Sequence, residues 1–363
     1  MTRYLLAGGG TAGHVNPLLA VADRLVLRQP DAVIFVLGTA EGLESRLVPA
    51  RGYALLVVPR LPLPRRPDAA AARFPGRFTR LVDQIRALIR EHRIDVVVGF
   101  GGYVSAPAYL AARREGVAIA IHEANARPGM ANRLGARLTR FVGTAFRSAR
   151  LPHARFVGMP LREELESLDR PEKRREALEF FGLNPSRPTL LVTGGSQGAL
   201  HINEVVNAAA ATIIGAGWQI VHVTGERSPL PPTELAHYLL VSYCDRMDLA
   251  IAAADLAIAR AGAATVSEFS ALGVPAVYVP LAIGNGEQRL NARDVVAAGG
   301  ALLVANAEFS LRWIRDFLVP LLEDRARIAG MAARTLPVGA LDGADRMVDL
   351  IEDARAASAT VAP

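Results

Sequence analysis

This sequence has almost no cysteine and no long apolar run. Cys244 is its single cysteine, so an intrachain disulfide and a cysteine-based metal site are both excluded. No stretch approaches the roughly 20 apolar residues of a membrane-spanning helix, because the longest candidate, 249–259, is interrupted by Asp255. The apolar run after Met1 is too short for a signal peptide. We therefore expect a protein of the reducing cytoplasm that meets a membrane only at its surface.

Lysine is also nearly absent, and the arginines that replace it are unevenly distributed. Residues 1–162 hold 24 arginines and 10 acidic residues, a net charge of +14, whereas the remainder carries −8. A basic half predicts an anionic partner, which could be a nucleic acid, an anionic lipid or a phosphorylated substrate. Zinc-finger spacings and aromatic RNA-binding motifs are missing, so we expect no nucleic-acid partner.

Of the 363 residues 51% are apolar, enough for two buried cores. Short apolar runs alternate with helical patterns, which predicts parallel strands buried on both faces and an α/β fold of two doubly wound, Rossmann-like sheets. The polar, proline-rich stretch 157–188 predicts the boundary between domains 1–160 and 161–341. Six strands are expected in each half: 4–7, 33–37, 53–58, 95–98, 117–121 and 141–143, then 189–193, 218–224, 238–242, 255–259, 275–279 and 301–304.

A glycine-rich segment, Gly8–His14, follows the first strand and opens a helix expected over 15–27. Such a turn brings backbone N–H groups close to a phosphate or sugar. A plain tight turn would explain the glycines but not His14, which stands where ligands approach. The spacing also fits a dinucleotide-binding turn, but the next strand ends without the required carboxylate, and Glu41 comes too late. An NAD(P)-dependent oxidoreductase is therefore a remote alternative.

Similar junctions occur in the second half, at Gly194–Gly198 and at Arg260–Glu268. The second of these could hold a diphosphate at a helix start. Glu268, one turn into the helix, either accepts the hydroxyls of a ribose or only complements the helix dipole. The amides of 284–291 suit sugar hydroxyls, although Asn285 could simply cap a helix.

Two more polar loops, 99–105 and 122–127, follow buried strands at the same expected edge. For His122 and Glu123 we favour a hydrogen-bonded pair that holds its loop over a direct catalytic role. The sequence has no Asp-x-Asp pair and no His/Asp cluster at ligand spacing, so we expect no metal and no cofactor.

The segment 60–93 combines nine arginines with apolar residues. Residues 78–89 have the spacing of an amphipathic helix with a core-facing stripe. A second apolar group lies among the arginines and either joins the core or forms a membrane-surface patch; its members are Leu61, Leu63, Phe74 and Phe78.

Taken in order, these motifs resemble the MurG family of GT-B glycosyltransferases, over almost the whole chain. The matching segments are Gly9–Pro17, Gly101–Ser105, His122–Asn125, Gly194–Ala199, Gly262–Glu268 and Glu287–Ala292. The resemblance implies two Rossmann-like domains facing a cleft, with helix 342–354 returning to the first domain. It also implies a metal-independent, inverting hexosyltransferase on the cytoplasmic face of the bacterial membrane. Such an enzyme moves N-acetylglucosamine from UDP-N-acetylglucosamine to lipid I, the polyprenyl-pyrophosphate-linked peptidoglycan precursor.

The resemblance also implies site residues. His14 matches the proposed general base. Donor contacts would come from Thr11, Ala12, Gly13, Asn125, Arg162, Ser196, Cys244, Ala263, Ala264, Thr265, Val266, Ser267, Glu268 and Gln288. Glu287 stands where some members have Gln, and Met159 where the family often has Asn. Two alternatives stay open: a soluble GT-B enzyme that glycosylates a small aglycone, and a non-catalytic nucleotide-sugar binding protein.

Overall fold

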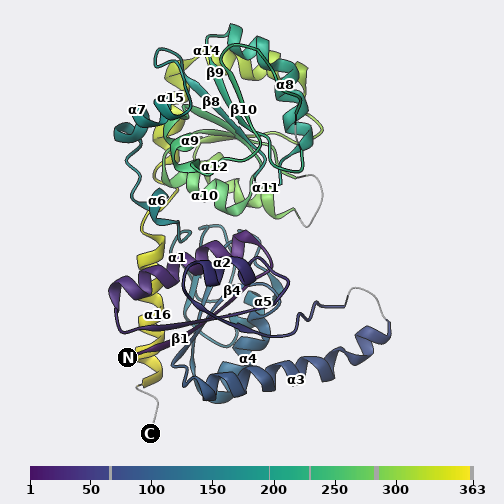
Figure 1. The fold of residues 1–363 in the computed structure, drawn as a ribbon, viewed down its shortest axis with the longest axis vertical. Helices are drawn as coiled ribbons and strands as arrows, with labels where there is room; N and C mark the ends of the chain where they lie inside the picture. The colour runs from purple at the N-terminus through teal and green to yellow at the C-terminus, as the bar shows by residue number, and fades with distance from the viewer. Residues whose placement is uncertain (65–67, 196, 229, 282–285, 360–363) are drawn as a thin grey trace. The chain divides into compact units, whose positions relative to one another are not determined.

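The computed structural model describes residues 1–64, 68–195, 197–228, 230–281 and 286–359. The chain forms two compact units (Figure 1). Unit 1 consists of Met1–Arg162 and the segment from Asp342 onward, and unit 2 of Glu163–Leu341. Each contains a parallel sheet, so the predicted α/β class with two doubly wound sheets is confirmed.

The sheet of unit 1 has seven strands in the order β3-β2-β1-β4-β5-β6-β7, and every neighbouring pair is parallel. The central strands are buried on both faces, as their uninterrupted apolar sequences predict. The strands are β1 Arg3–Gly8, β2 Val33–Gly38, β3 Ala54–Val57, β4 Val96–Gly101, β5 Ala118–Glu123, β6 Val142–Thr144 and β7 Ala154–Phe156.

All six strands predicted for this half are confirmed, but the total of six is wrong, because β7 adds a seventh strand at the edge of the sheet. Ala154 and Arg155 are exposed and Phe156 is only half-buried, so this short strand has no apolar run to reveal it. Its position at the edge of the sheet explains why two of its three residues are exposed.

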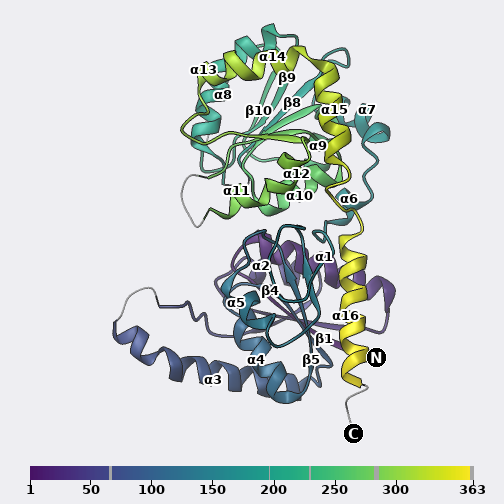
Figure 2. The same ribbon diagram turned by 180° about the vertical axis from the view of Figure 1, so that it is seen from behind.

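Helices cover both faces of this sheet (Figures 1 and 2). The last helix, α16, packs on α1 and on β5, and Met347, Val348 and Ile351 complete the core beneath it. The helices of unit 1 are α1 Ala12–Arg28, α2 Glu44–Ala50, α3 Ala69–Glu91, α4 Ser105–Glu115, α5 Met130–Gly135 and α16 Gly343–Ala359.

Helix α3 is longer than the stripe 78–89 that predicts it, and its N-terminal part reaches beyond the sheet (Figure 2). The side chain of Asp68 caps it by accepting from the N–H of Ala71. The core-facing stripe is confirmed, with Leu81, Val82 and Ile85 buried. Within the described residues, neither this helix nor another is both long and apolar enough to cross a membrane.

The apolar residues that precede the stripe have different environments. Leu61 is 9% exposed and belongs to the core, so of the two alternatives left open for it the structure favours the core. Leu63 is 52% exposed. Phe74 and Phe78 are half-buried and stack on each other, with ring centroids 5.6 Å apart.

Unit 2 has the six parallel strands that the sequence predicts, and their order in the sheet is β10-β9-β8-β11-β12-β13. They are β8 Thr189–Thr193, β9 Gln219–Val223, β10 Tyr238–Val241, β11 Leu256–Ala259, β12 Ala276–Tyr278 and β13 Ala301–Leu303. The helices are α6 Glu163–Glu166, α7 Arg170–Phe180, α8 Leu200–Gly215, α9 Met247–Ala253, α10 Ala263–Ala271, α11 Glu287–Asn291, α12 Arg293–Ala297, α13 Leu311–Trp313, α14 Val319–Glu323 and α15 Arg325–Thr335, with a π-helical turn at Ile314–Leu318.

Candidate functional site

The first glycine loop of unit 1 joins the end of β1 at Gly8 to the start of α1 at Ala12. It packs against the loop that follows β4, because a Cβ at Gly102 would lie 2.8 Å from the carbonyl oxygen of Gly9. Gly10 and Gly102 have φ values of +86° and +85°, a region that favours glycine. The close approach of the two loops therefore depends on the missing side chain at Gly102.

His14 lies in the first turn of α1 and is half-buried. Its Nδ1 is 3.1 Å from the carbonyl oxygen of Gly9 and 3.3 Å from the hydroxyl oxygen of Thr11. A carbonyl oxygen can only accept a hydrogen bond, so Nδ1 carries a proton, and Nε2 is the nitrogen that has the lone pair whenever the ring is neutral. Nε2 faces Gly101, where an added Cβ would lie 3.0 Å away.

Glu123 ends β5 and holds the loop that contains Asn125. It accepts from the N–H groups of Asn125 at 2.9 Å and Gly129 at 3.0 Å, and from the side chain of Asn132 at 2.9 Å. Burial raises the pKa of this carboxyl, and these hydrogen bonds oppose the rise. The contacts support a loop-holding role for Glu123, and Asn125 is half-buried at the same edge of the sheet as His14.

His122 is fully buried, and its Nε2 is 3.0 Å from the carbonyl oxygen of Gly158. Burial lowers its pKa to about 4, so the ring is neutral at physiological pH. Its hydrogen bond goes to Gly158 and not to Glu123, so the predicted pairing of the two side chains is wrong. Glu123 bonds forward along its own loop, whereas His122 connects β5 to the segment after β7.

The sequence does not single out Glu44, yet this residue contacts the first glycine loop. Its Oε2 accepts from the N–H of Gly10 at 2.8 Å, and it is 1% exposed. The sequence offers one indication, namely that Gly38 and Gly42 flank the turn before it.

In unit 2, α10 starts directly after β11, with Gly262 as its N-cap residue. No acidic residue lies in its first turn, and the first N–H groups of a helix have no intrahelical partner, which favours an anion there. Ala263, Ala264 and Thr265 are half-buried in this turn, and Val266 and Ser267 follow as buried residues. Glu268 lies one turn further on and is half-buried.

A second helix start, that of α11, lies next to α10. The side-chain oxygen of Gln288 accepts from the N–H of Leu281 at 2.9 Å, which ties the helix to the loop after β12. The amide of Asn291 donates to the carbonyl oxygen of Ala261 at 3.3 Å. Gln288 and the first turn of α10 are thus held together, while Asn285 lies outside the described residues.

The other residues predicted to contact the donor nucleotide lie on different elements. Strand β8 neighbours β11, so the loop 194–198 starts beside α10, although Ser196 itself lies outside the described residues. Cys244 follows β10 at the far edge of the sheet and is half-buried, and burial raises the pKa of its thiol. Arg162 is half-buried and is the last residue of the first segment of unit 1.

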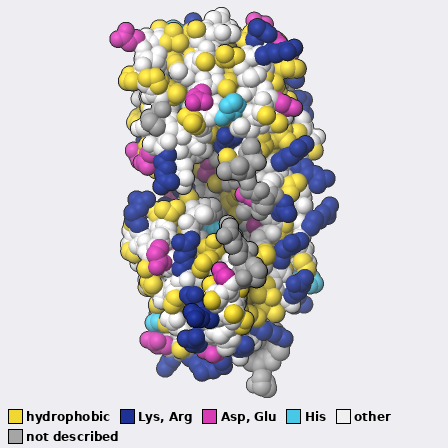
Figure 3. Space-filling model, turned by 90° about the vertical axis from the view of Figure 1, so that its right-hand side faces the viewer, with side chains coloured by type: hydrophobic (Ala, Val, Ile, Leu, Met, Phe, Trp, Pro, Cys, Tyr) yellow, Lys and Arg dark blue, Asp and Glu magenta, His cyan; other side chains and the backbone are white. Residues whose placement is uncertain are grey.

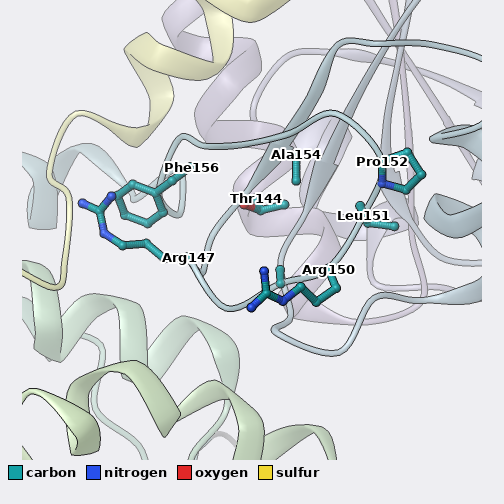
Figure 4. Close-up of a pocket in the computed structure, with 8 residues that line it drawn as sticks. Thr144, Arg147, Arg150, Leu151, Pro152, Ala154 and Phe156 are labelled. Atoms are coloured by element: carbon teal, nitrogen blue, oxygen red, sulfur yellow. The ribbon is translucent and has the colours of Figure 1, made fainter.

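The described residues of unit 1 line cavities of different sizes. A small one of about 70 Å³ borders the first glycine loop and is lined by Gly9, Gly10, Thr39, Glu41, Gly42, Glu44, Arg60, Tyr103 and Val104. A wider depression of about 540 Å³ lies over β6 and β7 (Figure 4). Its two arginines come from the β6–β7 loop, and Arg147 lies 3.9 Å from the ring centre of Phe156. None of the predicted site residues lines this depression.

The described part of the chain contains no group of three or more His, Cys, Asp or Glu side chains that could hold a metal ion. The polar groups around these loops are helix N-termini, the backbone of the glycine loops, side-chain amides and the imidazole of His14. Such groups suit a phosphorylated ligand that carries hydroxyl groups.

Comparison with known proteins gives matches over nearly the whole chain. The glycosyltransferase family 28 N-terminal domain matches residues 4–144, and the corresponding C-terminal domain matches residues 189–347. A protein of Leifsonia xyli subsp. xyli is 64% identical over 97% of this chain and 98% of its own length, and one of Clavibacter sepedonicus is 58% identical over 98% and 97%. Both are named UDP-N-acetylglucosamine–N-acetylmuramyl-(pentapeptide) pyrophosphoryl-undecaprenol N-acetylglucosamine transferase. The crystal structure of Acinetobacter baumannii MurG aligns with a TM-score of 0.78 and 26% identity, over 97% of this chain and 100% of that one.

Proposed function

Because this chain belongs to glycosyltransferase family 28, both of whose domains it contains, we propose that it transfers N-acetylglucosamine from UDP-N-acetylglucosamine to the 4-hydroxyl of lipid I. The product is lipid II, the next intermediate of peptidoglycan synthesis. The single observation that carries the proposal is the 64% identity, over nearly full length, to a relative named for this transfer. The resemblance to the MurG family and the GT-B fold are confirmed by the same comparisons.

The reaction itself needs a base and a stabilised leaving group. The acceptor hydroxyl gives its proton to Nε2 of His14, and its oxygen attacks the anomeric carbon from the side opposite the diphosphate. The transition state has oxocarbenium character, and the configuration inverts. The tautomer of His14, with the proton on Nδ1, supports this role, because Nε2 is then the nitrogen able to accept.

UDP leaves with added negative charge, which the start of α10 stabilises. Its unpartnered N–H groups and dipole act where this charge develops. Glu268 accepts the ribose hydroxyls, and the backbone at Cys244 pairs with uracil. The other donor contacts are those of Thr11, Ala12, Gly13, Asn125, Arg162, Ser196, Ala263, Ala264, Thr265, Val266, Ser267 and Gln288.

A polyprenyl-linked acceptor keeps its chain in the bilayer, so the enzyme works at the membrane surface. We propose that the N-terminal part of α3 docks there. Arg73, Arg77 and Arg80 are exposed and have no acidic partner among the described residues, and Phe74 and Phe78 lie beside them. Apolar and basic side chains are interspersed on the face that Figure 3 shows. Basic residues near an anionic leaflet contribute about 1 kcal/mol each, so the binding is peripheral and sensitive to salt.

The deciding experiment measures UDP release from UDP-N-acetylglucosamine with and without a lipid I analogue. The proposal expects release that depends on the analogue. Release that depends equally on a small soluble aglycone would favour the alternative GT-B enzyme, and UDP binding without turnover would favour a non-catalytic binding protein. In a thermal-shift panel UDP should stabilise the protein and NAD should not, since only a ligand of the folded state raises the melting temperature.

A further inference from the structure

Glu44, the first residue of α2, joins the first glycine loop to the neighbouring strand. Its Oε2 accepts from the N–H of Gly10 at 2.8 Å. Its Oε1 accepts from both the N–H and the hydroxyl of Thr39, each at 2.9 Å. A single buried carboxylate therefore connects the loop after β1 to the end of β2.

Three glycines make room for this carboxylate. A Cβ added at Gly9, Gly38 or Gly42 would come closer than 3.0 Å to atoms of Glu44. None of the three has a positive φ, so their backbone conformation does not require glycine. Glycine is needed at these positions because the side chain of Glu44 fills the space that a Cβ would occupy. This indicates a site built around the carboxylate.

Glu44 is charged at neutral pH. Burial by itself would raise the pKa of this carboxyl, but hydrogen bonds from the N–H groups of Gly10 and Thr39 outweigh burial and hold the pKa below its ordinary value. The N–H of Gly10 is thus occupied by a carboxylate, and a substrate phosphate near this loop has to use other donors.

The contact reaches His14 through one peptide group. The N–H of Gly10 and the carbonyl of Gly9 belong to the same planar peptide, and they point in opposite directions because the bond is trans. The N–H donates to Glu44, while the carbonyl oxygen accepts from Nδ1 of His14 at 3.1 Å. Two hydrogen bonds on opposite ends of one peptide orient it and polarise each other.

We propose that Glu44 is a positioning residue of the transfer reaction: through the peptide between Gly9 and Gly10, its carboxylate sets the orientation and the tautomer of His14. This role rests on the proposed function, in which Nε2 of His14 takes the acceptor proton. Without the carboxylate the peptide can rotate, the carbonyl of Gly9 no longer faces Nδ1, and the proton distributes between both ring nitrogens.

The test compares Glu44→Gln with Glu41→Gln. Glutamine keeps the shape, but it cannot accept on both sides, so the bond to Gly10 or the pair to Thr39 is lost. Glu41 is the matched control, because it is exposed, lines the same small cavity and, among the described residues, forms no hydrogen bond to the glycine loop. In Glu44→Gln the ¹⁵N shifts of the His14 ring should move from a single tautomer toward a mixture. They should stay unchanged in Glu41→Gln, with the signals assigned by their loss in His14→Gln.

The kinetic expectation is specific to positioning. Glu44→Gln should lower kcat about 10- to 100-fold, as small misplacements of a reacting group do, with the donor KM unchanged. Wild-type ¹⁵N shifts together with wild-type kcat overturn the proposal, as does a parallel loss of donor binding, which would show a general fold defect.

Two further results are covered by the same design. If Glu44→Gln does not fold, as judged by its circular dichroism, Thr39→Val replaces it, because this variant removes only the hydroxyl that donates to Oε1. A smaller shift of the His14 tautomer in the same direction then supports the proposal, and no shift overturns it. If the wild-type protein transfers no N-acetylglucosamine, the proposed function fails, while the ¹⁵N shifts still decide whether Glu44 controls His14.

Discussion

A proton held on Nδ1 of His14 by the carbonyl of Gly9 leaves Nε2 ready to accept another. We predict that His14→Ala lowers kcat by about 10²-fold or more, the usual contribution of a general base. UDP affinity should persist, since the helix start assigned to the diphosphate lies in unit 2. The pH–rate profile provides the check: a mutant that keeps the acidic limb of the wild-type profile would show that His14 is not the base.

Glu268 lies one turn into α10, where it would bind ribose in the ground state and the transition state alike. Glu268→Ala should therefore raise the donor KM more than it lowers kcat. Loss of a charged hydrogen-bonding partner costs about 1.5–3 kcal/mol, or roughly ten- to a hundredfold in affinity. Steady-state kinetics with varied donor test this, with the exposed Glu308 changed to Ala as a control. An unchanged donor KM would remove Glu268 from the ribose site.

His122 makes stability depend on pH. Its pKa in the folded protein is about 4, below the ordinary value near 6.5, because burial disfavours the charged ring. The unfolded chain therefore takes up a proton first, so stability is fully present above pH ~6.5 and is lost as pH falls toward about 4. From pH 7.5 to pH 5 this residue should cost about 2 kcal/mol of unfolding free energy. In urea titrations His122→Gln should show a shallower loss over that range, and an identical loss would exclude His122 as its source.

At the scale of elements, α3 has two different surfaces along one helix. Its C-terminal part lies on the core through Leu81, Val82 and Ile85, while Arg73, Arg77 and Arg80 are exposed toward its N-terminal end. Changing these three arginines to Glu should weaken co-sedimentation with phosphatidylglycerol vesicles and slow turnover of a long-chain acceptor. Turnover of a short-chain soluble acceptor should be unchanged, because none of the predicted site residues lies on this helix.

The control for this experiment carries the same charge change in unit 2, with the exposed Arg175, Arg312 and Arg327 changed to Glu. It should bind vesicles almost as the wild type does. Equal binding by wild type and the α3 variant, both at low salt and at about 0.5 M salt, where the Debye length is near 4 Å, would show that α3 is an ordinary solvated surface.

Elements with apolar runs were predictable from the sequence, and elements without them were not. Runs such as Thr189–Thr193 gave strand positions because parallel strands are buried on both faces. Strand β7 was not predictable, because it lies at the exposed edge of the sheet and has no apolar run. The first turns of α3 were not predictable because Pro75 and Gly76, which have low helix propensity, lie inside the helix. The N-cap at Asp68 helps to offset their cost in stability.

The same contrast holds for the candidate site. The glycine loops and His14 were found because their residue types have a restricted set of uses. Glu44 was not, because its role depends on a contact between residues 34 apart in the chain, which spacing does not reveal. The bond from His122 to Gly158, across 36 residues, was missed for the same reason.

At the scale of the whole molecule, unit 1 is completed by a helix from the far end of the chain. Met347, Val348, Leu350 and Ile351 of α16 are at most 3% exposed in its core. Burial of four such side chains contributes about 6–12 kcal/mol, comparable with the entire stability of a domain. Acidic residues of α16 also form ion pairs with Arg28 of α1. The carboxylate of Asp349 lies 2.7 Å from the guanidinium of Arg28.

We therefore predict that a protein ending at Leu341 loses the cooperative unfolding of unit 1 but still binds UDP through unit 2. Calorimetry and UDP titration would measure the two effects separately. Arg355→Ala, an exposed change on the same helix, should behave as the wild type does. If the truncated protein still showed a cooperative unfolding transition for each unit, α16 would not be needed for the stability of unit 1.

The return of α16 to unit 1 also fixes an order in time. Ribosomes add about 5–20 residues per second, so the segment Glu163–Leu341 takes about 10–35 seconds to synthesise after the first part of unit 1 has emerged. Throughout that interval one face of the first sheet lacks one of its covering helices, whereas the second unit can fold as soon as its own continuous sequence has emerged. The half of the molecule that is made first is thus the half that finishes folding last, and part of its apolar core stays exposed while the other half is made.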